Sequence, residues 1–534
     1  MPSIPDRIGG VAAATVLVSA TPTFAHGFGQ RYDLPLPLTM WVSAAGLTIV
    51  ISFVVVAMFM REQRTACDYT RIDLLRIPLV RGLASPIVGD TIRALVALIF
   101  LLTLVAGLIG VQESVRNLIV PMIWVIWWVG FSFASVLFGN IWPSVNPLRT
   151  LFTYGEEFSK SVLRIRHHSS PRPYPEALGY WPAAVFFVGF AWSELIWPEN
   201  NTPSFLALEI ILYSIITWTG MCFYGEDWLE HGDAFTVAFG VLARFAPFEI
   251  RTGASPGAEQ PSITPKTPAP MSVGGTAAPS STGGVRNDIG WNLRLPGAGL
   301  LADRGVTWSL VVFVLTMLST VTFDGFLETP LFQNLSDWVH ASSPTANLIA
   351  ALSFGGIDDE ATIKTVTLIL FPCAFVVVFA LASWLMIEVA GQWSIGKVRS
   401  PQNPTISDVS RGFVLTLVPI AVAYHFAHYF SLLVDGGQFI IPLASDPFGF
   451  DWDLFGTAGY EVNIGIISPY VYWYAALVAI VIGHIIAVYL AHATALRLFP
   501  NQKAALASQV PMVVLMAGYT MVSLWILAQP IVGK

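Results

Sequence analysis

The sequence has few charged residues and few cysteines. Lys, Arg, Asp and Glu make up only 11% of its 534 residues, whereas hydrophobic residues make up 54%. So few charges exclude a water-soluble protein of ordinary composition and indicate a surface that meets lipid. The net charge of −7 argues against a nucleic-acid partner. The three cysteines, Cys67, Cys222 and Cys373, are odd in number and have no metal-ligand spacing, so they predict neither a disulfide framework nor a zinc knuckle.

Two phosphate-binding motifs are also missing. The sequence contains no GxxxxGK[ST] loop, which argues against an ATP-driven pump. It contains no GxGxxG fingerprint either, which argues against a nicotinamide enzyme. The chemistry must therefore come from side chains inside the hydrophobic segments or in the loops between them.

The first 25 residues are typical of a signal peptide. Arg7 precedes an apolar run at 11–20, and the small residues Thr23 and Ala25 stand at the −3 and −1 positions of a cleavage site. Cleavage after Ala25 would make His26 the first residue of the mature chain, outside the cytoplasmic membrane. A free amine and an imidazole at that position can chelate copper if a second histidine lies nearby, and His340 is one partner for such a site.

Apolar runs of about 20 residues, the length that crosses roughly 30 Å of hydrocarbon, recur along the rest of the chain. They predict an all-α polytopic membrane bundle of about ten transmembrane helices. Residues 26–250 form a first half with five spans, 251–290 a disordered linker rich in Pro, Gly, Ser and Thr, and 291–534 a second half with five spans. The expected spans are 41–60, 91–111, 118–137, 181–197, 205–223, 307–323, 365–390, 412–434, 468–493 and 508–531.

The distribution of basic residues predicts the orientation. With His26 outside, nearly all Lys and Arg residues fall in the loops on the other side, and only Arg31, Arg116, Lys364 and Lys534 fall outside. The positive-inside rule therefore places both mature ends outside the membrane, which we expect to be a bacterial inner membrane. The segment 435–467 contains five acidic residues and no Lys or Arg, and such an outer surface would attract cations.

Two histidines lie one turn apart in the eighth span, in the stretch YHFAHYF. The spacing puts His425 and His428 on one helical face, and a count of about 1.5 Å per residue places His484 of the ninth span at a similar depth. Polar side chains at that depth are costly and usually mark function. We predict that the three histidines ligate a divalent metal or a haem, with Asp435 as an outer neighbour. A proton or substrate path and simple interhelical hydrogen bonding are the alternatives.

Carboxylates form two further groups. Glu194, Glu209, Asp324 and Glu388 fall inside or at the ends of spans, and Glu194 and Glu209 are predicted to share a proton or a cation because a short outer turn joins their spans. The segment GEDWLEHGD follows the fifth span and is a second choice for a metal site, since carboxylate and imidazole ligands together suit divalent metals. Its candidate ligands are Glu226, Asp227, Glu230 and His231. A solvated helix end would have the same pattern.

Four segments along the mature chain resemble those of bacterial polytopic membrane proteins named fenitrothion hydrolases. They are AHGFGQRYDLPLPL, FGNIWPSVNPLRTL, YGEDWLEHGDAFTVAFGVLARFAP and AYHFAHYFSLLVDGGQFIIPLASDPFG. The resemblance implies hydrolysis of an organophosphate phosphotriester by a membrane enzyme with a second subunit as its partner.

Two functional hypotheses follow. In the first, a metal at the histidines generates a hydroxide that attacks the phosphorus of a small hydrophobic substrate. In the second, the protein moves metal ions or electrons across the lipid bilayer. A haem spectrum would favour the second hypothesis.

Overall fold

The computed structural model describes residues 36–60, 71–162, 171–251, 290–301, 305–353, 358–392, 404–463, 465–499 and 501–529. In these ranges nine helices are long and apolar enough to cross a membrane, which confirms the predicted all-α polytopic bundle. The predicted signal peptide, His26 and almost all of the predicted linker lie outside the described residues. The nine helices are α1 (Leu38–Phe59), α3 (Pro86–Ile109), α4–η3–α5 (Ile119–Phe138), α9 (Pro203–Tyr224), α12 (Trp308–Leu327), α15 (Asp359–Gln392), α16–η5–α17 (Ile406–Gly437), α19 (Pro469–Leu498) and α20 (Gln502–Ala528).

The fourth expected span is a shorter helix than the sequence predicts. It forms α8 (Trp181–Leu195), whose 15 residues extend over only about 22 Å. Pro182 stands in its first turn, where a missing N–H costs nothing, and the chain leaves the helix just before Pro198. Because α8 packs against α12 and α11 rather than lying at the periphery, its length is set by its protein neighbours.

Helix α12 is the central helix of the bundle. In the most apolar 18-residue stretch of α12, 78% of the residues are buried, compared with 22% in the corresponding stretch of α3. Its hydroxyl side chains can be buried because they bond to carbonyls of their own helix, as Thr322 does to Leu318. Asp324, near its end, is the one acidic residue of the helix and is also buried.

Helices α17 (Val418–Gly437) and α19 cross at close range. A Cβ atom on Gly483 would lie 2.7 Å from the Pro419 carbonyl oxygen and would also collide with the Cβ of Ala423. Small residues at this crossing let the two backbones approach closely, as is usual where helices pack in lipid.

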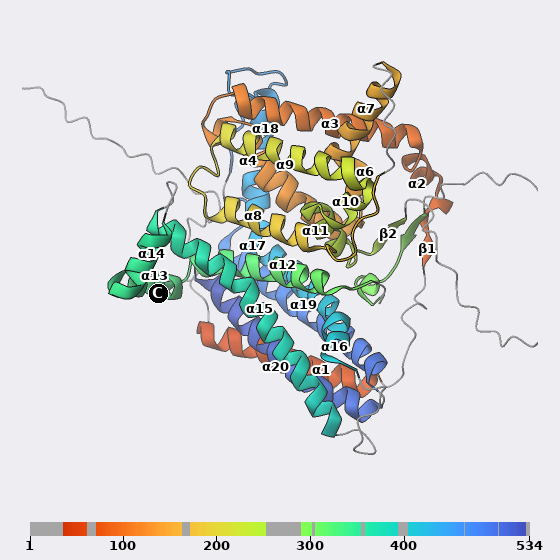
Figure 1. Ribbon diagram of the computed structural model, residues 1–534, viewed down its shortest axis with the longest axis vertical. Coiled ribbons are helices and arrows are strands. Elements are labelled where there is room, and N and C mark those ends of the chain that lie inside the picture. Colours follow the sequence, from red (N-terminus) through yellow and green to blue (C-terminus); the bar gives the residue numbers. More distant parts are fainter. Residues whose placement is uncertain are drawn as a thin grey trace, which may run out of the picture.

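Three short strands mark one end of the bundle. β1 (Ile72–Asp73) and β2 (Phe248–Arg251) both pair antiparallel with β3 (Gly290–Leu293), so that Ile72 and Phe248 both face Leu293. We call this the strand end; α2 (Pro78–Leu83), α6 (Trp142–Val145) and α7 (Pro147–Ser161) also lie there. At the opposite end are α13 (Pro330–Ala341), α14 (Ser343–Leu352) and α18 (Ile440–Ser445) (Figure 1).

A re-entrant segment follows α9. Gly225, with φ of 65°, reverses the chain into α10 (Glu226–His231), which packs back along α9. Asp233 then caps α11 (Ala234–Ala243), and its Oδ1 accepts a hydrogen bond from the Tyr213 hydroxyl, halfway along α9. Helix α11 therefore begins in the middle of the bundle and returns to the strand end. The sequence predicts a second-choice metal site or a solvated helix end here and no further helix, whereas the structure adds this second, almost wholly buried helix.

Candidate functional site

A narrow recess enters the bundle from the end opposite the strands. Its walls come from η3 (Met122–Gly130), from the α8–α9 turn at Asn200 and from α17. Its volume is about 60 Å³, which is room for a few water molecules. Glu194, Asp324 and Tyr429 line it, so two carboxyl groups and a phenol converge in a space that only small species can enter.

Asp324 and His428 form the central contact of this site. The Nε2 atom of His428 lies 2.8 Å from Oδ2 of Asp324, and the Tyr429 hydroxyl donates to the same oxygen at 2.8 Å. His428 also stacks on the ring of Tyr424 at 6.1 Å. Depending on where the proton lies, either His428 donates to the carboxylate or a protonated Asp324 donates to His428, so the pair shares one exchangeable proton.

The two predicted partners Glu194 and Glu209 have different neighbours. Glu209 of α9 accepts a hydrogen bond of 2.7 Å from Ser193, whereas Glu194 faces the recess together with Asp324. Ionised carboxylates in one recess repel each other, and a bound proton or cation relieves that repulsion. Glu194 therefore belongs with Asp324 in the candidate site.

His425 is buried between aromatic rings. Its ring lies 5.5 Å from Phe133, 5.8 Å from Trp128 and 4.8 Å from Tyr429. Its Nε2 atom is buried and has no hydrogen-bond partner among the described residues. A buried nitrogen without a partner costs about 1–3 kcal/mol, which makes His425 an expensive residue if its role is only structural.

His484 has other neighbours again. Its Nδ1–H donates to the Ile480 carbonyl at 2.8 Å, its ring lies 6.3 Å from that of Tyr519, and its buried Nε2 has no partner among the described residues. The three predicted ligands thus contact different elements: η3 and α5 for His425, α12 for His428 and α20 for His484. Within the described ranges no group of three or more His, Cys, Asp or Glu side chains is arranged to hold a metal ion.

Two further predicted side chains, Asp435 and Glu388, and the histidine His492 make no contact with this pair among the interactions of the described residues. Asp435 of α17 has a buried Oδ1 without a hydrogen-bond partner in the described part of the chain. Glu388 lies four residues before the end of α15, toward the strand end. His492 contacts Gln509 at 3.0 Å and the Met60 carbonyl at 2.9 Å, so it joins α19 to α20 and to the end of α1.

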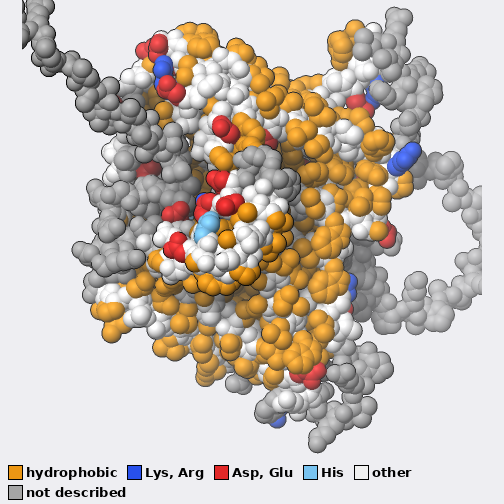
Figure 2. Space-filling model, turned by 60° about the vertical axis from the view of Figure 1, so that its left-hand side comes forward, with side chains coloured by type: hydrophobic (Ala, Val, Ile, Leu, Met, Phe, Trp, Pro, Cys, Tyr) orange, Lys and Arg blue, Asp and Glu red, His pale blue; other side chains and the backbone are white. Residues whose placement is uncertain are grey.

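The surface at the opposite end is acidic. Figure 2 shows Asp and Glu side chains gathered on this face around a histidine, with few basic side chains nearby. His340, the proposed partner of His26, lies in α13, and its Nδ1–H donates to the Ser336 carbonyl at 2.9 Å. Because His26 is outside the described residues, the copper site stays a prediction.

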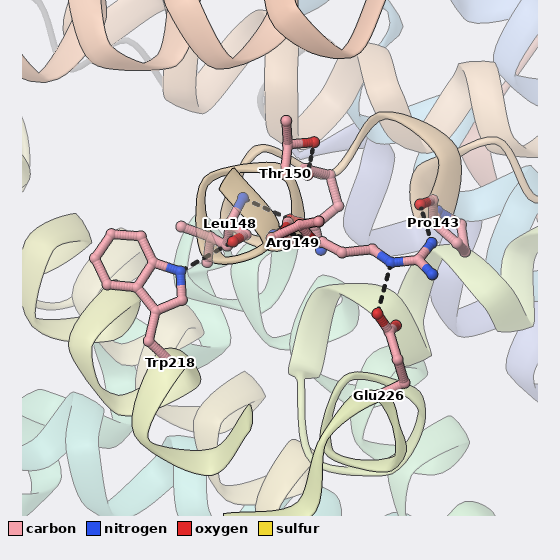
Figure 3. A network of polar contacts seen from close by, with 8 residues as sticks. Pro143, Leu148, Arg149, Thr150, Trp218 and Glu226 are labelled. Atoms are coloured by element: carbon pink, nitrogen blue, oxygen red, sulfur yellow. Dashed lines mark hydrogen bonds and ion pairs between the residues drawn. The ribbon is translucent and has the colours of Figure 1, made fainter. Parts of the chain in front are cut away.

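The second-choice residues do not converge. Glu226 binds Arg149, with Oε1 3.0 Å from Nε, as Figure 3 shows. His231 donates to the Asp227 carbonyl and lies between the rings of Tyr174 and Tyr180, at 5.2 and 5.1 Å. Burial raises the pKa of Tyr174 to about 12, so this phenol stays neutral and donates to the Gly179 carbonyl. Glu230 is exposed.

An aromatic barrier separates the recess from the strand end. Trp127 and Trp128 lie in η3, whose wide π-helical turns are common at functional sites. The ring of Trp127 lies 4.3 Å from that of Phe235, the ring of Trp128 lies 4.9 Å from that of Phe190, and the Phe190 and Phe235 rings lie 5.0 Å apart. Phe235 is the second residue of α11, so the re-entrant helix supplies part of the barrier.

Sequence reasoning missed two of the tyrosines at the site. Tyr429 and Tyr424 flank the two histidines in the sequence, and a buried hydroxyl in a span requires a partner just as an imidazole does. Tyr429 directly follows His428 in the sequence. Its position next to a buried histidine could have indicated that both side chains contact the same acid, Asp324 of α12. The comparisons with known proteins add no assignment: no family model, curated protein or solved structure matches this chain.

Proposed function

We propose that the protein is a membrane transport protein that takes up a small cation, a proton or a metal ion, at Asp324, His428 and Glu194. The observation that carries the proposal is the contact of His428 with Asp324, a carboxylate that lines a recess of about 60 Å³. That volume suits a few waters or a small ion, whereas sites for organic ligands usually occupy about 300–1,000 Å³. The acidic surface at this end of the molecule would attract cations to the side from which the recess enters the bundle.

The pair can hold and release a proton without a large movement. His428 and Asp324 share one proton, and Tyr429 keeps the acceptor oxygen oriented by a second hydrogen bond. Glu194 lines the same recess and exchanges protons or cations with the outer solution. His425 lies 4.8 Å from Tyr429, between this site and the aromatic barrier, and is the next group along the path.

The orientation of the path follows from the basic residues. The positive-inside rule places the strand end in the cytoplasm and the recess outside, in a bacterial inner membrane. A protease site inserted near Thr276, which lies outside the described residues, is expected to be cut in inverted vesicles only. Cleavage from the outside of intact spheroplasts would reverse the orientation.

Cation flux in proteoliposomes tests the proposal. Protein reconstituted with pyranine or a zinc-sensitive dye inside should report protons or zinc entering under an imposed gradient. We expect Asp324→Asn to lower the flux at least about tenfold, equivalent to 1.4 kcal/mol. Gly189→Leu is a control substitution outside the site, because Gly189 is exposed and a Cβ atom added there would meet no atom within 4 Å. Equal flux through wild type and Asp324→Asn, or wild-type flux no higher than in empty liposomes, would refute the proposal.

Metal-assisted hydrolysis is the second proposal. It is supported by the four segments that resemble those of fenitrothion hydrolases. It requires a metal at His425, His428 or His484 and a phosphotriester as substrate. Metal analysis and an absorption spectrum of the purified protein test it, with His425→Ala and His428→Ala as variants. Loss of bound metal in both variants would favour this proposal, a Soret band would favour electron transfer, and a full metal content in both would leave the histidines as interhelical contacts.

A further inference from the structure

A second and much larger recess opens at the strand end. Its volume is about 510 Å³, within the usual range for sites that bind small organic molecules. The re-entrant helix α11 forms one wall, and α6, α7, α10, β2 and Arg294, the residue after β3, contribute to the others. Leu229, Val237, Val241, Phe248 and Leu310 give it apolar surface, while charged side chains from several elements enter it.

Three arginines line this recess, and two of them have acidic partners. Arg149 binds Glu226 at 3.0 Å and donates to the Pro143 carbonyl at 2.8 Å (Figure 3). Arg294 lies 3.4 Å from Glu249 and also donates to carbonyls at the end of α11, those of Ala243, Arg244 and Ala246. Both guanidinium groups therefore already have partners within the protein.

Arg244 is the third arginine, and its charge is not matched. It follows the last residue of α11, is partly buried, and forms no ion pair with a carboxylate of the described residues. Glu230, the remaining acid of the recess, is exposed and forms no ion pair with it. Burial lowers the pKa of the Arg244 guanidinium, the nearby Tyr180 opposes this shift and Arg294 adds to it. An arginine nevertheless stays charged at neutral pH, so its fork of N–H donors remains available to an anion.

We infer that the strand-end recess binds a small organic anion, with Arg244 holding its carboxylate or phosphate group and the apolar wall of α11 holding its hydrocarbon part. This inference goes beyond the cation uptake proposed above, and anion binding does not depend on it. Gly240 lies in the wall of the recess, and a Cβ atom added there would meet no protein atom within 4 Å. The wall is therefore open at the point where the organic part of the ligand would lie.

Thermal unfolding of the detergent-purified full chain tests the site. Benzoate and phenyl phosphate are the probes, and benzyl alcohol is the neutral control of similar shape. A ligand that binds only the folded state raises the melting temperature with its concentration. We expect both anions, but not benzyl alcohol, to stabilise the wild type. Arg244→Ala should weaken binding at least about tenfold, and Arg244→Lys should weaken it less, because lysine keeps the charge but loses the fork.

A second pair of variants keeps the test valid if Arg244→Ala unfolds. Gly240→Leu should fill the recess and abolish the shift, whereas Gly189→Leu, which places the same side chain on an exposed part of α8, should leave it unchanged. The inference fails if neither anion stabilises the wild type, or if Gly240→Leu binds as well as Gly189→Leu. It also fails if only phosphatidylglycerol in nanodiscs gives a shift that depends on Arg244, because the anion would then be a lipid headgroup. These measurements involve no cation flux. The anion site can therefore be refuted while the transport proposal holds, and the transport proposal can be refuted while the anion site holds.

Discussion

Asp324 of α12 and His428 of α17 are 104 positions apart in the sequence, yet Oδ2 of one lies 2.8 Å from Nε2 of the other. The side chain of Asp324 is 2% exposed, so the contact forms inside the bundle rather than at its surface. Helices α12 and α17 thus meet through the one acid of α12 and one of the two histidines of α17.

Removing the Tyr429 hydroxyl should weaken this contact without abolishing it. Tyr429→Phe deletes one of the two hydrogen bonds to Asp324 Oδ2, and a net hydrogen bond to a charged group contributes about 1.5–3 kcal/mol. We expect a lower melting temperature and a smaller loss of cation flux than in Asp324→Asn. Flux equal to that of Asp324→Asn would assign Tyr429 to the transport step itself.

Replacing His425 by phenylalanine separates stability from function. The change removes a buried nitrogen that has no partner among the described residues and keeps an aromatic ring beside Trp128 and Phe133. We expect His425→Phe to unfold at the same temperature as the wild type or higher, while its cation flux falls. Normal flux in a stabilised variant would show that His425 has no part in the path.

The crossing of α17 and α19 should be intolerant of added volume. Gly483→Val would push side-chain atoms into Pro419 and Ala423, and overpacking of this kind costs about 1–3 kcal/mol. Gly518→Val is the matched control, because Gly518 of α20 is exposed and a Cβ atom there would meet no atom within 4 Å. Thermal unfolding in detergent should show a lower melting temperature for Gly483→Val only. Equal melting temperatures for the two variants would mean that the helices can move apart at little cost.

Loss of the Arg149–Glu226 ion pair should have little effect on stability. Both side chains are well exposed, at 41% and 54%, and such pairs contribute about 0–1 kcal/mol. We expect Glu226→Gln to change the free energy of unfolding by less than about 1 kcal/mol and to leave bound metal unchanged. A loss of metal in this variant would instead support the second-choice site near Glu226.

The sequence by itself determined that the protein lies in a lipid bilayer and which segments form its long helices. Apolar runs such as 205–223 and 468–493 can satisfy their backbone only as helices in lipid, so composition and length sufficed to predict α9 and α19. It also identified Asp324 and His428 individually, because a charge or an imidazole within such a run is costly and therefore conspicuous. The re-entrant helix α11 was missed because ten apolar residues are too few to be distinguished from a loop next to a span.

Only the tertiary structure decided which polar groups meet. Periodicity gives the face on which His425 and His428 lie, but the direction of that face depends on how α12, α17, α19 and η3 pack around one another. That packing is set by distant small residues such as Gly483 and by the wide turns of η3, which no local pattern encodes. The sequence therefore grouped the histidines with one another, whereas packing gave His428 to Asp324, His425 to the aromatic barrier and His484 to its own helix and Tyr519.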